Sequence, residues 1–165
     1  YLRLLDETVR NIMRGDGGPK LVPADVSVDT PSYLPHDYVP SHEAKLDIYR
    51  RLTRLTVPGD IDALQTEVRD RFGPLPPAAE RFFLNALLRV VGGSLGVEGI
   101  IVRGDEARVT FRENAVPRMK GMSAAFHGVQ FKAEVRRPHP LSLKLTRLGG
   151  SDILSGLVRA LRGIA

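Results

Sequence analysis

The sequence predicts an α+β fold in which a helical N-terminal half is followed by a mostly antiparallel sheet flanked by helices. Two observations carry this prediction. Apolar residues recur at helical spacing as far as residue 91, and they alternate with polar residues, as in strands, after Gly92-Gly93. The chain has 165 residues, of which 42% are hydrophobic, so it is large enough to form one domain with its own core.

The first 20 residues are predicted to lie outside that domain. Apolar side chains at helical spacing predict an amphipathic helix over residues 1–14. The glycines and proline of residues 15–19 are expected to end this helix and form a flexible joint. The chain also starts without methionine or a capping residue, which suggests a piece of a longer protein. We therefore expect residues 1–20 to be a helix and linker from a preceding domain, and residues 21–165 to be the domain itself.

A short strand and a proline-rich segment come next. Val26 and Val28 alternate with polar residues, which predicts a strand that would suit a sheet edge. Residues 32–40 read Ser-Tyr-Leu-Pro-His-Asp-Tyr-Val-Pro, and each proline favours extended geometry in the residue before it. Ser41 is then expected to cap a helix. The predicted apolar stripe of that helix is Leu46, Tyr49, Leu52 and Leu55.

Two more helices are predicted before the sheet. Pro58-Gly59 is expected to break the chain, so the first of them spans residues 60–72 and ends at Gly73. Its apolar stripe is Ile61, Leu64, Val68 and Phe72. Pro76-Pro77 opens the second helix, which is apolar on nearly every side over residues 82–91. We expect this helix to be the buried spine of the domain and Gly92-Gly93 to stop it.

Alternating residues predict the sheet. A hairpin is expected around the Gly104-Asp105-Glu106 turn, and residues 129–135 and 141–145 give two further strands. Such clean alternation is typical of an antiparallel sheet with one covered face and one wet face. A short helix is expected at residues 116–122, and a last helix after Ser151-Asp152.

Charge is distributed unevenly along the chain. The formal net charge is +5, with 11 Lys+Arg against 13 Asp+Glu in residues 1–82 and 13 against 6 in residues 83–165. A basic half can mark nucleic-acid binding, here through Arg136, Arg137, Lys144 and Arg147. Spread cations on a solvated surface explain the same numbers, because only Arg136 and Arg137 are adjacent in this half.

Motifs that carry catalysis or cofactors are missing. The sequence has no phosphate-binding glycine loop with its lysine, and no nucleophile elbow. It has no cysteine, and its four histidines lack metal-ligand spacing, so surface or loop positions are expected for them. No segment approaches the length needed to cross a bilayer. We therefore expect no enzyme activity, cofactor, metal or membrane contact from this chain.

One polar constellation remains on the predicted helix 60–72. Asp60, Ala63, Glu67 and Asp70 fall on one face, away from the apolar stripe. The residues alone favour a solvated face, with Glu67 and Arg71 forming an i, i+4 ion pair. A protein-binding surface is the alternative.

Two motifs resemble a known family. The first is the proline segment with Tyr33, Pro35, Tyr38 and Pro40, followed by Tyr49 in the next helix; the second is Arg71, Phe72 and Gly73. In order, spacing and identity they resemble the C-terminal domain of bacterial transcription-repair coupling factors, from about Val26 to Gly96. Beyond Gly96 only the order of elements fits.

The resemblance implies a regulatory role rather than catalysis. In that family this domain clamps onto a UvrB-like module of the same protein, which masks UvrA recruitment and restrains translocation until RNA polymerase is engaged. Glu67 and Asp70 match the family's interface positions, and arginines on the module are their implied partners. The resemblance also implies a cytoplasmic parent with DNA-binding and ATP-binding parts elsewhere. We expect this chain to be a monomer that does not itself bind nucleic acid.

Overall fold

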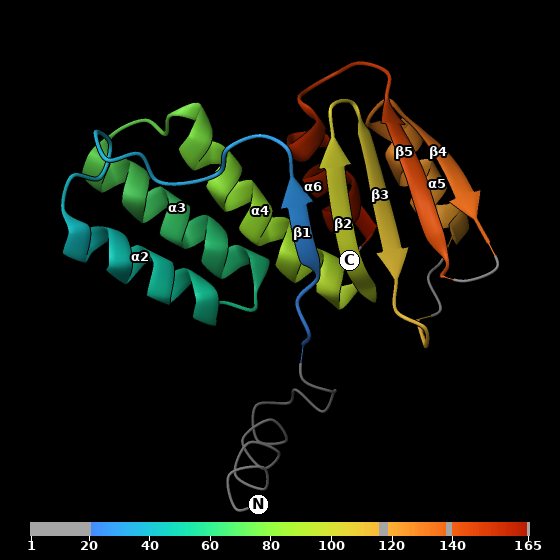
Figure 1. Ribbon diagram of the computed structural model, residues 1–165, viewed down its shortest axis with the longest axis horizontal. Helices are drawn as coiled ribbons and strands as arrows, with labels where there is room; N and C mark the ends of the chain where they lie inside the picture. The colour runs from blue at the N-terminus through green and yellow to red at the C-terminus, as the bar shows by residue number, and fades with distance from the viewer. Residues whose placement is uncertain (1–20, 116–118, 138–139, 165) are drawn as a thin grey trace, which may run out of the picture.

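The computed structural model describes residues 21–115, 119–137 and 140–164 (Figure 1). The predicted helix over residues 1–14, its linker and the domain boundary at residue 20 lie outside the described residues or are not tested by them. The elements are β1 (Asp25–Val28), α2 (His42–Arg54), α3 (Pro58–Phe72), α4 (Pro77–Ser94), β2 (Val97–Arg103), β3 (Glu106–Phe111), α5 (Met119–Gly128), β4 (Phe131–Arg136), β5 (Ser142–Arg147) and α6 (Ile153–Ile164).

The five strands form one mixed sheet in the order β1-β2-β3-β5-β4. β1 pairs with β2 in parallel, and the other three pairings are antiparallel. The α+β class and the mostly antiparallel sheet are therefore confirmed, and β1 lies at an edge as predicted. The predicted hairpin is β2–β3, in which Arg103 faces Glu106 across Gly104-Asp105. Gly104 has φ 60°, the positive value that tight hairpin turns require and glycine adopts readily.

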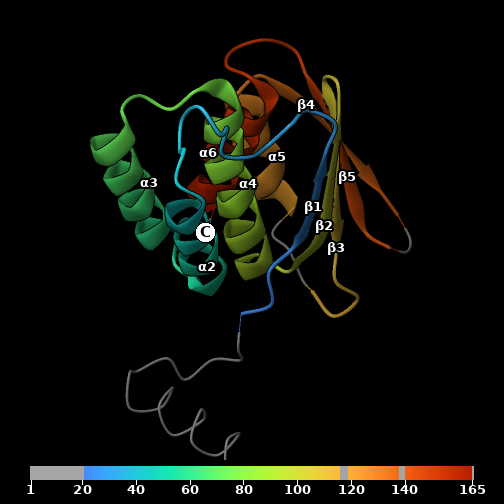
Figure 2. The same cartoon turned by 60° about the vertical axis from the view of Figure 1, so that its left-hand side comes forward.

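Among the described residues, the helices that pack on this sheet all lie on one of its faces. Figure 2 shows α4, α5 and α6 on the same side of the strands, with the opposite face open. Side chains that point toward the helices are buried, as Ile100, Val102 and Val109 are, whereas Ile101 on the open face is 49% exposed. The predicted division into a covered face and a wet face is therefore correct.

Helix α4 is the spine of the domain, as its sequence predicts. Phe83 and Leu88 are fully buried, and the helix packs against α3, α6, β1 and β2. The α2 and α3 helices lie beyond α4, on the side away from the sheet (Figure 1). One hydrophobic core therefore joins the helical half to the sheet through a single central helix.

The glycines at the end of α4 do not stop it. The helix continues through Gly92 and Gly93 to Ser94, and the chain turns at Gly96, where φ is 81°. A Cβ on Gly93 would lie 2.3 Å from the Val22 carbonyl oxygen. The glycines therefore serve the close approach of the segment before β1, which the sequence alone did not indicate.

Three other predicted boundaries or stripes differ from the structure. α3 begins at Pro58 rather than Asp60, because proline is tolerated in the first helical turn. On α2 the buried residues are Ala44 and Ile48, and Leu46 is 38% exposed. This helix lies at the outside of the molecule, so only a narrow stripe is covered. The predicted short helix is the ten-residue α5, which extends to Gly128.

Candidate protein-interaction surface

The four predicted interface residues all lie exposed on α3. Asp60, Ala63, Glu67 and Asp70 are spaced by three or four residues, which places them on one side of the helix. A neighbouring face of the helix buries Ile61, Leu64 and Val68. We call the exposed four residues the α3 strip. It carries three carboxylates and no large apolar side chain, so it offers a partner charge rather than a hydrophobic patch.

Local sequence fixes both ends of α3. Pro58 lies in the first turn, and Gly73 closes the helix with φ 93°, a conformation that suits glycine. The Tyr38 hydroxyl donates a hydrogen bond of 2.7 Å to the Gly73 carbonyl oxygen. Burial raises the pKa of the Tyr38 hydroxyl, and the nearby Arg69 charge partly offsets this effect. The proline segment thereby fixes the C-terminal end of α3, whose last turn carries Asp70.

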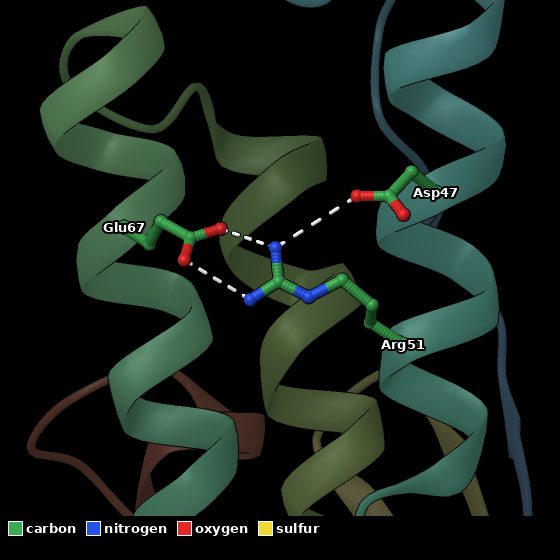
Figure 3. A network of polar contacts seen from close by, with 3 residues as sticks. All are labelled: Asp47, Arg51 and Glu67. Atoms are coloured by element: carbon green, nitrogen blue, oxygen red, sulfur yellow. Dashed lines mark hydrogen bonds and ion pairs between the residues drawn. The ribbon is translucent and has the colours of Figure 1, made fainter.

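Glu67 is already paired within the chain (Figure 3). Both guanidinium nitrogens of Arg51 on α2 donate to its carboxylate, Nη1 to Oε2 and Nη2 to Oε1, the latter at 3.0 Å. Arg51 Nη1 also lies 3.8 Å from Oδ2 of Asp47, one turn earlier on α2. The bidentate pair joins the two outer helices at their exposed seam.

This pairing replaces the one suggested by helical spacing. Glu67 bonds to Arg51 rather than to Arg71, whose guanidinium lies 4.9 Å from the centre of the Phe72 ring. The hydrogen bond from Arg51 is the main cause that holds the pKa of Glu67 below its ordinary value, and the charges of Arg51 and Arg71 add to it. Glu67 is therefore ionised at neutral pH. Its pairing with Arg51 depends on tertiary packing that no single-helix pattern shows.

The other two carboxylates of the strip differ from Glu67. Within the described part of the chain, neither Asp60 nor Asp70 takes part in a side-chain hydrogen bond or ion pair. Asp62, on the flank of α3, forms a bidentate pair with Arg162 of α6, at 3.2 and 2.8 Å. Arg51 of α2 and Arg162 of α6 thus neutralise two acidic residues of α3, Glu67 and Asp62. The strip stays negatively charged because of Asp60 and Asp70.

The motif residues of the proline segment form a scaffold. Pro35 accepts hydrogen bonds from the backbone N–H groups of Tyr38 and Val39, which closes a turn. Tyr33 is 48% exposed, and its N–H donates to the Ala78 carbonyl oxygen at the start of α4. Pro40 is exposed and directly precedes Ser41, whose hydroxyl caps α2 as predicted.

The aromatic members of the motif pack across elements. The Tyr38 and Phe72 rings lie 6.0 Å apart, and Tyr49 meets Phe82 of α4 edge-on at 5.0 Å. The Leu34 N–H points at the Tyr49 hydroxyl at 3.5 Å. These contacts bind the proline segment to α2, α3 and α4, so its residues position the surface rather than form it.

The basic residues considered for nucleic acid are mostly paired. Arg136 lies 3.3 Å from Glu134, Lys144 lies 3.9 Å from Glu106, and Arg147 lies 2.9 Å from Asp105. Arg137 is exposed at the end of β4. Paired cations on β4 and β5 make a weaker phosphate-binding surface than the sequence count suggests.

The described residues contain neither a candidate metal-binding cluster nor a helix that could span a membrane. Across residues 21–115, 119–137 and 140–164, no group of three or more His, Cys, Asp and Glu side chains could hold a metal ion. His36, His42 and His127 are exposed, and His139 lies outside the described part. No helix in that part is long and apolar enough to cross a membrane.

Sequence reasoning missed Arg51 and Asp47. They are four residues apart on a predicted helix, which is the spacing of an intrahelical ion pair, and this signal could have singled them out. Nothing in the sequence shows that Arg51 reaches across to α3.

Comparisons with known proteins agree with the motifs. Residues 28–122 match the model of the TRCF domain family. Among curated proteins, the transcription-repair-coupling factor of Myxococcus xanthus is 26% identical over 173 aligned residues, covering 100% of this chain and 14% of that protein. The protein of the same name from Mycobacterium bovis is 30% identical over 154 residues, covering 85% of this chain and 12% of that protein.

A solved structure shows the same fold. The crystal structure of a C-terminal domain of transcription-repair coupling factor matches with a TM-score of 0.74 at 20% identity, covering 87% of this chain and 94% of that one. The chain spans only 12–14% of the length of the curated relatives named above. By its family match over more than half its length, this chain belongs to the TRCF domain family and corresponds to the C-terminal domain of transcription-repair coupling factors.

Proposed function

We propose that this chain is a non-catalytic regulatory domain that docks on a UvrB-like module of its own parent protein. Docking through the α3 strip covers the site that recruits UvrA and keeps translocation slow until RNA polymerase is engaged. The observation that supports the proposal is the strip itself: three carboxylates lie exposed on one helix face, and two of them, Glu67 and Asp70, match the family's interface positions by the sequence resemblance.

The chemistry of the strip favours a cationic partner. Carboxylates on a rigid helix suit bidentate bonds from arginine, which are stronger than neutral hydrogen bonds. Tyr38 and Gly73 hold the end of α3 that carries Asp70, so little ordering is needed on binding. Because the strip and the UvrB-like module would belong to one protein, the contact would be intramolecular and would have a high effective concentration.

The test replaces Glu67 and Asp70 with alanine in the full-length parent. Both side chains are exposed, so we expect the fold to tolerate the change. Leaving the partner arginines unpaired costs the docked state roughly 2–5 kcal/mol, which is enough to open a substantial fraction of molecules. UvrA binding and basal ATP turnover should both rise.

A matched control removes two negative charges elsewhere. Glu80 on α4 and Glu98 on β2 are exposed and lie off the strip. Replacing both with glutamine should leave UvrA binding and ATP turnover unchanged. If the Glu67/Asp70 variant is folded yet behaves like this control, the strip is only a solvated helix face and the proposal is wrong.

A nucleic-acid-binding accessory domain is the second candidate function. It rests on the excess of cations in residues 83–165 and on exposed Arg137. Gel shifts of the chain with duplex DNA at increasing salt separate the two functions, because phosphate contacts weaken steeply as salt rises. Binding that shows such a slope and is lost on Arg137→Gln would favour this candidate.

A further inference from the structure

Arg51 lies between two carboxylates on the seam of α2 and α3. Its two terminal nitrogens are both used by Glu67, and one of them also faces Asp47 at 3.8 Å (Figure 3). All three side chains remain accessible, with exposed fractions of 42% for Arg51, 52% for Glu67 and 60% for Asp47. The cluster can therefore rearrange without repacking the core.

The Arg51–Glu67 pair competes with docking through Glu67. The inference below rests on that proposed docking. A partner arginine that approaches Glu67 finds both carboxylate oxygens occupied in bidentate fashion, and it meets the like charge of Arg51. The partner arginine therefore either displaces Arg51, or it uses the remaining lone pairs of the carboxylate against the repulsion of the Arg51 charge. Asp70 is not subject to this conflict, because no ion pair joins it to the rest of the described chain.

Asp47 is an alternative ion-pair partner for Arg51. The two residues are four apart on α2, which is the spacing at which an acidic side chain pairs with a basic one along a helix. If Arg51 releases Glu67, it keeps a carboxylate partner without any backbone movement. The release then costs little, since exposed pairs of this kind are individually weak.

We propose that Arg51 is a latch on the docking surface: it masks Glu67 in the undocked domain and transfers to Asp47 when a partner arginine takes Glu67. Asp70 makes the first contact with the partner. Glu67 makes the second contact, which forms only when the partner arginine displaces Arg51. The latch lowers the affinity of docking and thereby keeps the closed state releasable.

The test measures the apparent Kd of the full-length parent for UvrA. Because only the open state binds UvrA in this proposal, the apparent Kd rises as the open population falls. Arg51→Gln removes the competitor, so docking should tighten and the apparent Kd should rise by about two- to fivefold, the range that an exposed ion pair can supply. Arg50→Gln removes the same charge from the neighbouring exposed position and should leave the apparent Kd nearly unchanged.

The two sides of the pair should give opposite results. Glu67→Gln removes the docking contact itself, so the apparent Kd for UvrA should fall. A purely structural pair predicts the same direction for both variants, because each breaks the same bonds between α2 and α3. Opposite signs therefore distinguish a latch from a structural bridge.

Asp47→Asn tests the transfer step. Without the second partner, Arg51 should hold Glu67 more persistently, so the apparent Kd for UvrA should fall by up to about twofold relative to Glu43→Gln, a matched loss of charge on the same helix. In the Arg51→Gln background this difference should vanish, because the group that transfers is gone.

The outcomes separate the latch from the docking proposal. If Asp70→Asn and Glu67→Gln both lower the apparent Kd but Arg51→Gln matches Arg50→Gln or lowers it too, docking stands and the latch is wrong. If neither acidic variant changes it, docking through the strip fails and the latch fails with it. Should Arg51→Gln unfold, Arg51→Lys keeps the charge, loses the bidentate geometry and should raise the apparent Kd by a smaller factor.

Discussion

At the scale of single residues, burial separates two phenylalanines that the apolar pattern treats alike. Phe83 on α4 is fully buried, whereas Phe72 at the end of α3 is only partly buried, between Tyr38 and the Arg71 guanidinium. The position of Phe72 on its stripe alone predicts a loss on the order of 3–5 kcal/mol on truncation to alanine. Because Phe72 is partly exposed, we expect a smaller loss of stability than its position on the stripe predicts.

Phe83→Ala should lower the free energy of unfolding by about 3–5 kcal/mol, because it leaves a cavity in the centre of the core. Phe72→Ala should cost about 2 kcal/mol, since part of that ring already contacts water. Urea unfolding followed by circular dichroism measures both. Equal losses for the two variants would mean that Phe72 is as well packed as the core.

At the scale of elements, the sequence predicts what depends on periodicity and misses what depends on neighbours. Helix α3, its stripe of Ile61, Leu64 and Val68 and its end at Gly73 follow from spacing and glycine chemistry. The exposed strip follows from the same period. The bond from Arg51 to Glu67 does not, because it requires knowing how far apart α2 and α3 lie.

The glycines of α4 also show that periodicity does not predict packing. A glycine pair after a helical pattern is ordinarily a stop, and only the packed segment at Val22 reveals why α4 carries Gly92 and Gly93 inside it. Likewise, Leu46 fits the apolar stripe of α2, yet its side chain is exposed. Periodicity identifies a face that can be buried, but packing decides which part of it is.

Gly93→Ala should therefore destabilise the domain by about 1–3 kcal/mol, although alanine is normally the better helix former. The added Cβ would lie 2.3 Å from a backbone oxygen, which cannot move without shifting the segment that leads into β1. Gly121→Ala on α5 is the control, since a methyl group there would meet no neighbouring atom within 4 Å, and it should be neutral or stabilising by up to about 1 kcal/mol. Thermal unfolding of the two variants should move in opposite directions.

At the scale of the whole molecule, α4 connects the outer helices to the sheet. It contacts α3 on one side and β1, β2 and α6 on the other, and its buried side chains belong to the single core cluster. The Asp62–Arg162 pair adds a link between α3 and the last helix at the surface. Within the described residues, the buried apolar side chains form one cluster that spans the helical half and the sheet.

We expect a single unfolding transition. Tyrosine fluorescence reports mainly on the helical half, where Tyr33, Tyr38 and Tyr49 lie, and far-ultraviolet circular dichroism reports on all elements. Their urea midpoints should coincide, and Phe83→Ala should shift both equally. A fluorescence transition at lower urea would show that α2 and α3 unfold before the sheet.

The position of β1 has a mechanical consequence. This strand of four residues is the first described element, and it lies at the sheet edge parallel to β2, with each of its residues in register from Asp25 opposite Gly99 to Val28 opposite Val102. A pull along the strand from the residues before Leu21 loads the whole ladder in shear, so its hydrogen bonds share the force instead of parting one by one. Tension in the preceding chain would thus be passed to β2 along the whole length of β1, without first separating the edge strand residue by residue.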